Sequence, residues 1–350
     1  MKNKKVNSIL IILSLVVLSI GLLIAGCSSQ VNKDASSSGD EETNEANSEA
    51  TNLKIGIIQI VEHPSLDAAR QGFLDALAEE GYKEGDNLSI NYQNAQGDMP
   101  TLNTIAKNLV AGGNDLILAI ATPTAQAVAN ASKNSSLPVL FTAVTDPVAA
   151  GLVKSMEKPD TNLTGTTDMA PVKDQIKLIQ EIKPDVQNIG IVYNTSEVNS
   201  VVQVELAKQA AADLGLNIVE GAATNSSEVD QAAKSLVGKV EAIYVPTDNT
   251  VVSALEAVIN VAKKNKLLLV SAENDSVKRG TVATIGLDYY KLGEQTGKMA
   301  IKILSGEGKP QDMPVESQSG NQITVNQKAA ADLGVVVPES ILERAAEIIK

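Results

Sequence analysis

The chain of 350 residues contains no tryptophan, two phenylalanines, one histidine and one cysteine. A single cysteine cannot form a disulfide within the chain, so packing alone must stabilise the core. One imidazole and one thiol are also too few for a typical zinc site, and the sequence predicts neither a metal nor a cofactor. With so few aromatic residues, we expect a core of isoleucine, leucine, valine and alanine.

Basic residues are also scarce. The chain has 29 lysines and arginines against 42 acidic residues, which gives a net charge of −13. Such acidity argues against nucleic acid as a partner, because nucleic acid favours basic surfaces. The length is sufficient for two domains of ordinary size.

The start of the chain has the features of an export signal. Three lysines among the first five residues precede an apolar run over 9–24, and Ala25, Gly26 and Cys27 follow it. This ending resembles a bacterial lipobox, which implies a signal peptide over 1–26 and a lipid on Cys27. An uncleaved membrane helix is an alternative, although the run is shorter than the roughly 20 residues that a spanning helix needs. A soluble exported protein is another.

Residues 27–52 are rich in serine, asparagine, aspartate, glutamate and threonine and contain almost nothing apolar. Such a segment cannot bury enough surface to fold. We therefore predict a disordered linker between the lipid on Cys27 and a folded region that begins near residue 53.

From residue 53 onward, short apolar runs alternate with amphipathic stretches, which is typical of βαβ units and parallel sheets. A helix is predicted to begin at Pro64 and Ser65 and to end near Gly81. The strands predicted in the first half are 54–60, 88–92, 115–120 and 138–142.

The second half repeats this order, and its 188–193 segment is similar to 54–59. The corresponding strands there are 188–193, 216–220, 241–245 and 267–271. A strand over 281–285, a helix over 290–304 and a return through 322–325 complete the chain. Two similar α/β domains with parallel sheets are the simplest interpretation.

In open parallel sheets, ligands bind beyond the carboxyl ends of the strands. Polar loops follow the predicted strands of both halves, so the loops would line one cleft if the halves face each other. Thr122 before Pro123 and Asp146 before Pro147 also have the pattern of a helix N-cap followed by proline. The six loops are 59–65, 122–125, 142–147, 193–200, 246–250 and 271–275.

The predicted cleft contains two kinds of charge-binding feature. Helix N-termini offer free N–H groups that suit an anion such as a carboxylate. The carboxylates of Asp248, Glu273 or Asp288 would suit a cationic group. The pattern fits a zwitterion, although a threonine, aspartate or asparagine before a helix is more often a cap than a ligand contact.

Motifs of common enzymes are missing. No Walker A loop, no Gly-x-Gly-x-x-Gly and no Gly-x-Ser-x-Gly occurs in the sequence. His63 beside Glu62 could serve as a general base, but no serine is indicated as a nucleophile. We expect a protein without catalytic residues, and an anchored hydrolase that uses His63 and Glu62 is the alternative.

Together, the lipobox, the linker and the two lobes resemble the substrate-binding lipoproteins of bacterial ABC importers. The segments 54–67, 121–126, 141–148 and 192–197 are similar to the tryptophan/tyrosine-type branch of that family. The resemblance implies a periplasmic-binding-protein type I fold of two Rossmann-like lobes with a hinge between them. Its crossings would lie near Gly165, Asp288 and Val315. Lobe one would then comprise 53–165 plus 289–314, and lobe two 166–288 plus 315–350.

The resemblance further implies an extracytoplasmic, lipid-anchored monomer that closes on an aromatic amino acid and presents it to a permease and an ATPase. Thr122, Thr124 and Thr145 would bind the carboxylate, and Asp248, Glu273 or Asp288 the ammonium. Loops 59–65 and 193–200 would line the side-chain slot. Tyr193, Tyr244, Tyr289 and His63 are the candidates for stacking on the ring. The expected ligand-binding set is Gln59, Glu62, His63, Ser65, Thr122, Thr124, Thr145, Asp146, Tyr193, Asn194, Glu197, Asn199, Asp248, Asn249, Glu273 and Asp288.

Two other functions remain open for the same fold. The ligand could be a nucleoside, a purine or a sugar. The protein could also be a sensor that passes lobe closure to a membrane receptor instead of an importer.

Overall fold

The structure is a computed structural model that describes residues 52–350. The predicted signal peptide, Cys27 and the polar linker lie outside this range. Within it, no helix is both long enough and apolar enough to cross a membrane.

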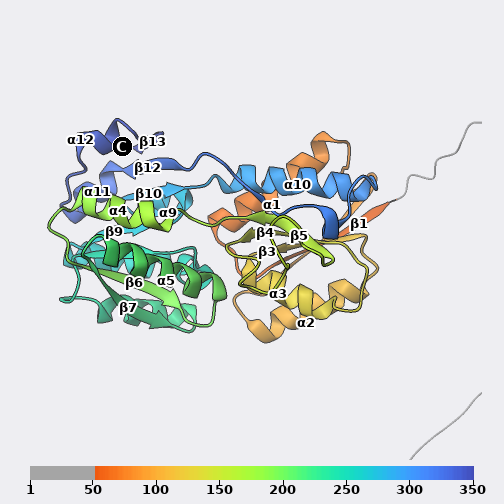
Figure 1. Ribbon diagram of the computed structural model, residues 1–350, viewed down its shortest axis with the longest axis horizontal. Coiled ribbons are helices and arrows are strands. Elements are labelled where there is room, and N and C mark those ends of the chain that lie inside the picture. The colour runs from red at the N-terminus through yellow and green to blue at the C-terminus, as the bar shows by residue number, and fades with distance from the viewer. Residues whose placement is uncertain (1–51) are drawn as a thin grey trace, which may run out of the picture. The chain divides into compact units, whose positions relative to one another are not determined.

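A six-stranded sheet forms lobe one, in the order β11-β5-β4-β3-β1-β2, and all of its pairs are parallel. Helices α1 and α10 pack together on one face, and α2 and α3 pack together on the other (Figure 1). The elements are β1 (Leu53–Gln59), α1 (Pro64–Glu79), β2 (Leu88–Asn94), α2 (Met99–Ala111), β3 (Leu116–Ile120), α3 (Thr122–Ala131), β4 (Val139–Val144), β5 (Leu163–Thr167), α10 (Tyr289–Leu304), the 3-10 turn η2 (Pro310–Asp312) and β11 (Glu316–Ser317).

Lobe two contains a seven-stranded sheet in the order β13-β12-β10-β9-β8-β6-β7. Its strands are β6 (Asn188–Asn194), β7 (Asn217–Ala223), β8 (Ala242–Val245), β9 (Leu268–Ser271), β10 (Ala283–Gly286), β12 (Gln322–Asn326) and β13 (Glu347–Ile349). Its helices are α4 (Val172–Ile182), α5 (Val198–Asp213), η1 (Ser226–Glu228), α6 (Val229–Ser235), α7 (Asn249–Ser253), α8 (Leu255–Asn265), α9 (Asn274–Arg279), α11 (Gln327–Leu333) and α12 (Glu339–Leu342).

The two sheets share one topology, which confirms the predicted repeat. The order β2-β1-β3-β4-β5 in lobe one matches β7-β6-β8-β9-β10 in lobe two. One pair departs from the expected parallel arrangement, because β12 runs antiparallel to β10. In both sheets the strand order reverses beside the first strand, and ligands of open α/β sheets bind at such a switch point.

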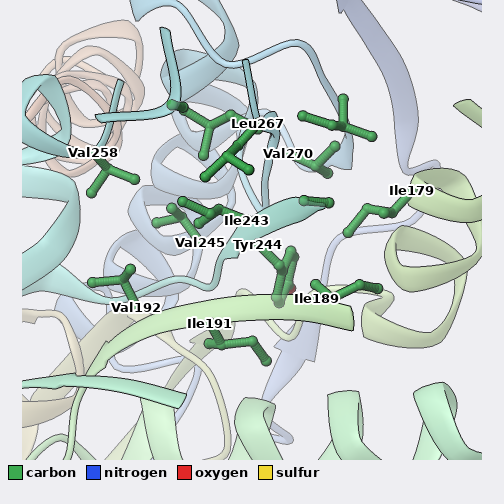
Figure 2. Packing of buried hydrophobic residues seen from close by; sticks show 14 of the residues in the cluster. Ile179, Ile189, Ile191, Val192, Ile243, Tyr244, Val245, Val258, Leu267 and Val270 are labelled. Carbon is green, nitrogen blue, oxygen red and sulfur yellow. The ribbon is translucent and has the colours of Figure 1, made fainter. Parts of the chain in front are cut away.

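Each sheet has an aliphatic core, as the composition predicts. In β1, Ile55, Ile57 and Ile58 are fully buried because helices cover both faces of the sheet. Figure 2 shows the core of lobe two, where isoleucines and valines of β6 and β8 pack against Val258 of α8. Tyr244 is a fully buried aromatic side chain within this cluster.

The crossings between the lobes differ slightly from the expected positions. Strand β5 continues to Thr167 within the sheet of lobe one, so the first crossing follows Thr167 and not Gly165. The second crossing lies between β10 and α10. Glu316 and Ser317 pair with β5, so the third crossing follows Ser317 and not Val315. Backbone pairing with β5 is the physical reason in both cases.

Helices α1 and α10 approach each other closely because glycines face the partner helix. A Cβ on Gly72 would overlap the carbonyl oxygen of Tyr290, and one on Gly293 would overlap that of Ala69. The N-terminus of α10 follows the second crossing, and the N-terminus of α1 lies at the end of β1. The glycine contacts therefore fix the position of α1 against α10, the helix that follows the second crossing.

Candidate functional site

Residues from both lobes meet at the carboxyl ends of the strands and enclose a small space, which we call the inner cavity. Its volume is about 10 Å³, which is room for about one water molecule. The lining residues are His63, Leu66, Ala143, Thr145, Asp168, Asn199, Thr247, Asp248, Asn249, Val252, Glu273 and Tyr289.

A second, wider space of about 410 Å³, the outer hollow, adjoins the inner cavity at Asn249. Lobe one contributes the apolar side chains of Ile60, Val61, Met99 and Pro123, together with the polar ones of Gln96, Asp98 and Gln126. Lobe two contributes polar groups. These include Asn194, Ser196, Glu197, Thr224, Asn225 and Thr250. The hollow thus joins the two loops expected to form the side-chain slot.

The loop after β1 brings several polar atoms into the interior of lobe one without hydrogen-bond partners. His63 takes the N-cap position of α1 but makes no capping bond with its side chain, and Pro64 begins the helix as predicted. His63 Nδ1, Ser65 Oγ and Gln59 Oε1 are buried without a partner. Gln59 Nε2 donates to Asp67 (3.0 Å), which fixes the loop against α1.

The start of α3 corrects one expectation. Thr122 does not cap the helix, because it is already the first helical residue and Ala121 is the N-cap, with φ of +81°. Thr122 and Thr124 are buried, and neither hydroxyl has a hydrogen-bond partner. Buried polar groups are nearly always paired, so two free hydroxyls at one helix N-terminus are unusual.

The end of β4 holds a second residue with positive φ, Ala143, at +56°. Such backbone costs about 1–3 kcal/mol for a residue other than glycine and is concentrated at functional sites. The helix expected after Asp146 is absent, because the carboxylate caps only a turn at the N–H groups of Val148 and Ala149. Thr145 faces the other lobe, and its hydroxyl lies 3.2 Å from that of Thr247.

On lobe two, Glu197 organises the loops around it. Its two carboxylate oxygens accept hydrogen bonds from Asn199 Nδ2, from the backbone and side chain of Asn249, and from the backbone and side chain of Thr250. Four of these five bonds connect the loop after β6 to the start of α7, and the fifth comes from the start of α5. The carboxylate therefore has a structural role in lobe two.

Asp248 has a similar position. Its Oδ1 caps α7 at Val251 N, and its Oδ2 accepts from Asn194 N and Ser200 Oγ, both at 2.6 Å. Burial, with a contribution from the charge of Glu197, raises the pKa of Asp248 to about 7.

Glu273 follows β9, is 2% exposed and accepts a hydrogen bond from Ser276 at 2.7 Å. Burial raises the pKa of this carboxyl, while the nearby hydroxyls of Ser65 and Ser276 favour its charged form. Ser65 belongs to lobe one, so the two lobes meet here, although the Ser65 hydroxyl makes no hydrogen bond of good geometry.

Asp168 lies on the first crossing and was not expected at the site. It is 4% exposed, with Oδ1 accepting from Thr145 Oγ1 (3.0 Å) and Oδ2 from the hydroxyl of Tyr289 (2.6 Å). Tyr289 follows the second crossing, so this bond connects two hinge segments. Burial raises the pKa of Asp168 to about 6, and the charge of Glu273 contributes.

His63 is neutral at physiological pH. Burial, reinforced by the charge of Arg279, lowers the pKa of its imidazole to about 4, although the side chain of Asn249 favours the protonated form. No group of three His, Cys, Asp or Glu residues within 52–350 is arranged to hold a metal ion.

The expected site residues fall into three groups. The inner cavity contains His63, Thr145, Asn199, Asp248, Asn249 and Glu273. The outer hollow contains Asn194 and Glu197, and also Asn249. The residues that line neither space are Gln59, Glu62, Ser65, Thr122, Thr124, Asp146, Tyr193 and Asp288.

Two of the four candidate stacking residues lie in the cavity wall, namely His63 and Tyr289. Tyr193 turns its hydroxyl towards Glu220 on β7 (2.5 Å), and Tyr244 is buried in lobe two with its hydroxyl on Gln175 (2.5 Å). Sequence reasoning missed Asp168 as a lining residue, because β5, the strand that it directly follows, was not predicted. Leu66, Ala143, Thr247 and Val252 were also missed.

A model of the ABC transporter substrate binding protein family matches residues 54–349. The chain belongs to this family. The "Tyrosine-binding protein" of Clostridioides difficile (strain R20291) is 44% identical over 326 residues, which cover 93% of this chain and 91% of that protein. Family membership implies that this substrate-binding protein works with a permease and an ATPase.

Two solved structures place the fold in more detail. The "ABC domain in complex with L-Trp from Streptococcus pneumonia" is 41% identical, with a TM-score of 0.82 over 85% of this chain and 100% of that chain. The "ligand-free, open structure" of a "substrate binding protein with adhesive properties from Clostridium difficile" is 47% identical. Its TM-score is 0.63, over 85% of this chain and 99% of that chain. The substrate-binding protein thus resembles the complex more than the open form, despite lower identity.

Proposed function

We propose that this substrate-binding protein binds an aromatic amino acid, L-tyrosine or L-tryptophan, between its lobes and delivers it to an ABC importer. The inner cavity would take the charged end of the amino acid, and the outer hollow its ring. Because the inner cavity has room for about one water molecule, the lobes must part to admit the ligand and close again over it.

The observation that carries this proposal is the pairing of two kinds of buried polar group across the cleft. Lobe one supplies buried hydroxyls without partners at helix N-termini, those of Ser65, Thr122 and Thr124, next in sequence to lining residues of the two spaces, and they suit a carboxylate. Lobe two supplies Glu273, whose buried carboxylate accepts one side-chain hydrogen bond and suits an ammonium. A zwitterion satisfies both sets at once, whereas a sugar or a nucleoside has no full charge for either.

The aromatic side chain is supported by the outer hollow and by the relatives. Ile60, Val61 and Met99 form an apolar wall against which a ring can pack, while Asn194 and Thr224 face it from lobe two. Such an amphipathic slot suits a phenol or an indole, which combine an apolar face with one polar group. The 44% identical relative is named for tyrosine, and the 41% identical structure holds L-Trp.

Isothermal titration calorimetry of residues 28–350 with each of the twenty amino acids tests this proposal. We expect binding of L-tyrosine or L-tryptophan at micromolar affinity or tighter. If none of the twenty amino acids produces heat, the proposal is wrong. Mass spectrometry of small molecules released from the purified protein would then identify a nucleoside, purine or sugar.

We also propose that Cys27 carries a lipid that anchors the protein, as a monomer, to the outer face of the cytoplasmic membrane. The support is the lipobox-like sequence, together with the polar linker of 27–52. Cys27→Ser should move the protein from the membrane fraction to the medium, with unchanged ligand affinity. Retention of this variant in the membrane would contradict the anchor.

A further inference from the structure

Three buried carboxylates line the inner cavity, Asp168, Asp248 and Glu273, and a fourth, Glu197, lines the adjoining outer hollow. They differ in how many hydrogen bonds they already accept. Glu197 accepts five and Asp248 three, all from lobe two. A carboxylate has about four lone-pair sites, so these two have little capacity left for a ligand. Their hydrogen bonds hold the loops of lobe two in place.

Asp168 differs from both of these carboxylates. It accepts two hydrogen bonds, both from hydroxyls, and none of the ion pairs among residues 52–350 involves it. Burial raises its pKa, as it also raises that of Asp248, so the difference between the two carboxyls lies in their hydrogen bonds. A buried carboxylate without a counter-ion is costly, and a cationic group brought by a ligand would remove that cost.

Two other atoms in the same cavity wall lack partners. Asn199 Oδ1 is an acceptor on a residue that is 3% exposed, and His63 Nδ1 lies on a residue that is 6% exposed. Both residues line the inner cavity together with Asp168. An ammonium group has three N–H donors, so it could satisfy Asp168 together with one of these acceptors.

Hydrogen bonds also connect Asp168, which lies on the first crossing, to lobe one and to the second crossing, and through Thr145 to lobe two. Tyr289, after the second crossing, donates to Oδ2, and Thr145 of lobe one donates to Oδ1. The Thr145 hydroxyl in turn lies 3.2 Å from that of Thr247 on lobe two. A cation bound at Asp168 would therefore lie where the closed lobes and the hinge meet.

We infer that Asp168, and not Asp248, binds the ammonium group of the amino acid and selects ligands that carry one. This inference rests on the proposed function, because it assigns one end of the proposed ligand. Glu273, which accepts a single hydrogen bond in its side chain, is the second carboxylate near the ammonium. Asp248 keeps its role as the cap of α7.

The test compares each amino acid with its analogue that lacks the amino group. Wild-type protein, Asp168→Asn and Asp288→Asn are titrated with L-tyrosine, L-tryptophan, 3-(4-hydroxyphenyl)propionate and 3-(indol-3-yl)propionate. Asp168→Asn should weaken amino-acid binding by about 30-fold or more, because the ammonium loses its charged partner. The variant should bind the propionates as well as the wild type does, so its preference for the amino group collapses.

Asp288→Asn is the matched control. Asp288 is also an aspartate of a crossing, but it caps α10 at Lys291 N and lines neither the inner cavity nor the outer hollow. Its variant should retain the wild-type preference. Asp168→Ser serves as a second charge-removing variant with the same expected result if Asp168→Asn does not fold.

The two proposals fail in distinguishable ways. If the wild type binds an amino acid and a folded Asp168 variant retains both its affinity and its preference over the propionates, the inference is wrong and the proposed function stands. If the wild type binds no amino acid at all, the proposed function fails and the inference fails with it. A loss of preference in Asp288→Asn as large as that in Asp168→Asn would also overturn the assignment.

Discussion

The two sides of the cleft are built from the same succession of strand, polar loop and helix, yet they satisfy their polar groups differently. On lobe one, the buried atoms without partners include Ser65 Oγ, Thr122 Oγ1 and Thr124 Oγ1. On lobe two, Glu197 and Asp248 together accept eight hydrogen bonds from neighbouring loops. Lobe two also has buried polar atoms without partners, at Asn199, Asn274 and Thr284, but the carboxylates of Glu197 and Asp248 already accept most of the hydrogen bonds that they can.

This difference indicates a division of labour, in which polar groups of lobe one pair with the ligand and those of lobe two hold the opposite wall in place. Free polar groups that are buried cost stability, so their retention on lobe one favours a ligand that pairs with them. The positive φ angles of Ala121 and Ala143 at the same strand ends add backbone strain on that side. Lobe two offers a rigid wall, because hydrogen bonds fix its carboxylates before any ligand arrives. The following predictions test this contrast, beginning with the largest effect.

Gly293→Ala should damage lobe one most. The new Cβ would overlap the carbonyl oxygen of Ala69, so α1 must move away from α10 and displace Ser65 at its N-terminus. We expect the free energy of unfolding in urea to fall by at least about 3 kcal/mol, with loss of ligand binding.

The matched control is Gly56→Ala in β1. Its Cβ would lie 3.2 Å from Nδ2 of Asn114 and 3.3 Å from Cδ2 of Leu109, which are side-chain atoms that need to shift by only a few tenths of an ångström, whereas the Gly293 contact is with backbone. This variant should unfold near the wild-type midpoint and bind ligand normally. If Gly293→Ala behaves like this control, the glycine contact does not position α1.

The repeated fold could be predicted from the sequence because it depends on local patterns. The apolar runs of β1 and β6 are similar, and both strands are buried on both faces, as a central parallel strand must be. The division near Gly165 could not be predicted correctly. Whether 163–167 stays in the first sheet depends on pairing with β4, which lies far from it in sequence.

The candidate site was predicted only in part. Strand-end loops identified His63, Thr145, Asn249 and others, because the carboxyl ends of parallel strands share one edge. The same pattern could not separate a cap from a free group. Asp248 and Thr122 both follow a strand at the start of a helix. The Asp248 carboxylate caps its helix, whereas the Thr122 hydroxyl has no hydrogen-bond partner.

Asp168 shows a different limit of sequence reasoning. Its importance comes from hydrogen bonds to Tyr289, 121 residues later, and to Thr145. No local spacing contains that information, since the three residues meet only when both crossings are in place.

A pair of hydroxyl deletions tests the contrast between the lobes directly. Thr122→Val removes a buried hydroxyl without a partner, so stability should stay unchanged or rise slightly, while affinity for L-tyrosine falls about 10-fold. Ser200→Ala removes the donor to Asp248 Oδ2, so the free energy of unfolding should fall by about 1–3 kcal/mol with a smaller change in affinity.

Urea unfolding and calorimetry on both variants separate the two effects. The division of labour would be refuted by the opposite pattern, in which Thr122→Val loses stability and keeps affinity. Equal losses of both properties in both variants would show that the two sides do not differ.

The smallest expected effect concerns Asp168 in the protein without ligand. Burial raises its pKa from 3.8 to about 6, so the folded state binds this proton more tightly than the unfolded state does. The wild type therefore loses stability as pH rises from about 4 to 6, and the loss is complete above that range. Asp168→Asn lacks the charge, so it should be more stable than the wild type at pH 8. We expect the gain in the free energy of unfolding to be only about 1 kcal/mol, because the amide is also costly to bury.

The difference between the two proteins should shrink as pH falls to 4.5, where the native carboxyl is protonated. Urea unfolding at pH 8 and pH 4.5 measures it without any ligand. A variant that is less stable than the wild type by the same amount at both pH values would show that Asp168 serves the fold alone. The predicted pattern would instead mean that the hinge keeps a carboxylate that costs stability, which is expected of a group retained to bind a cation.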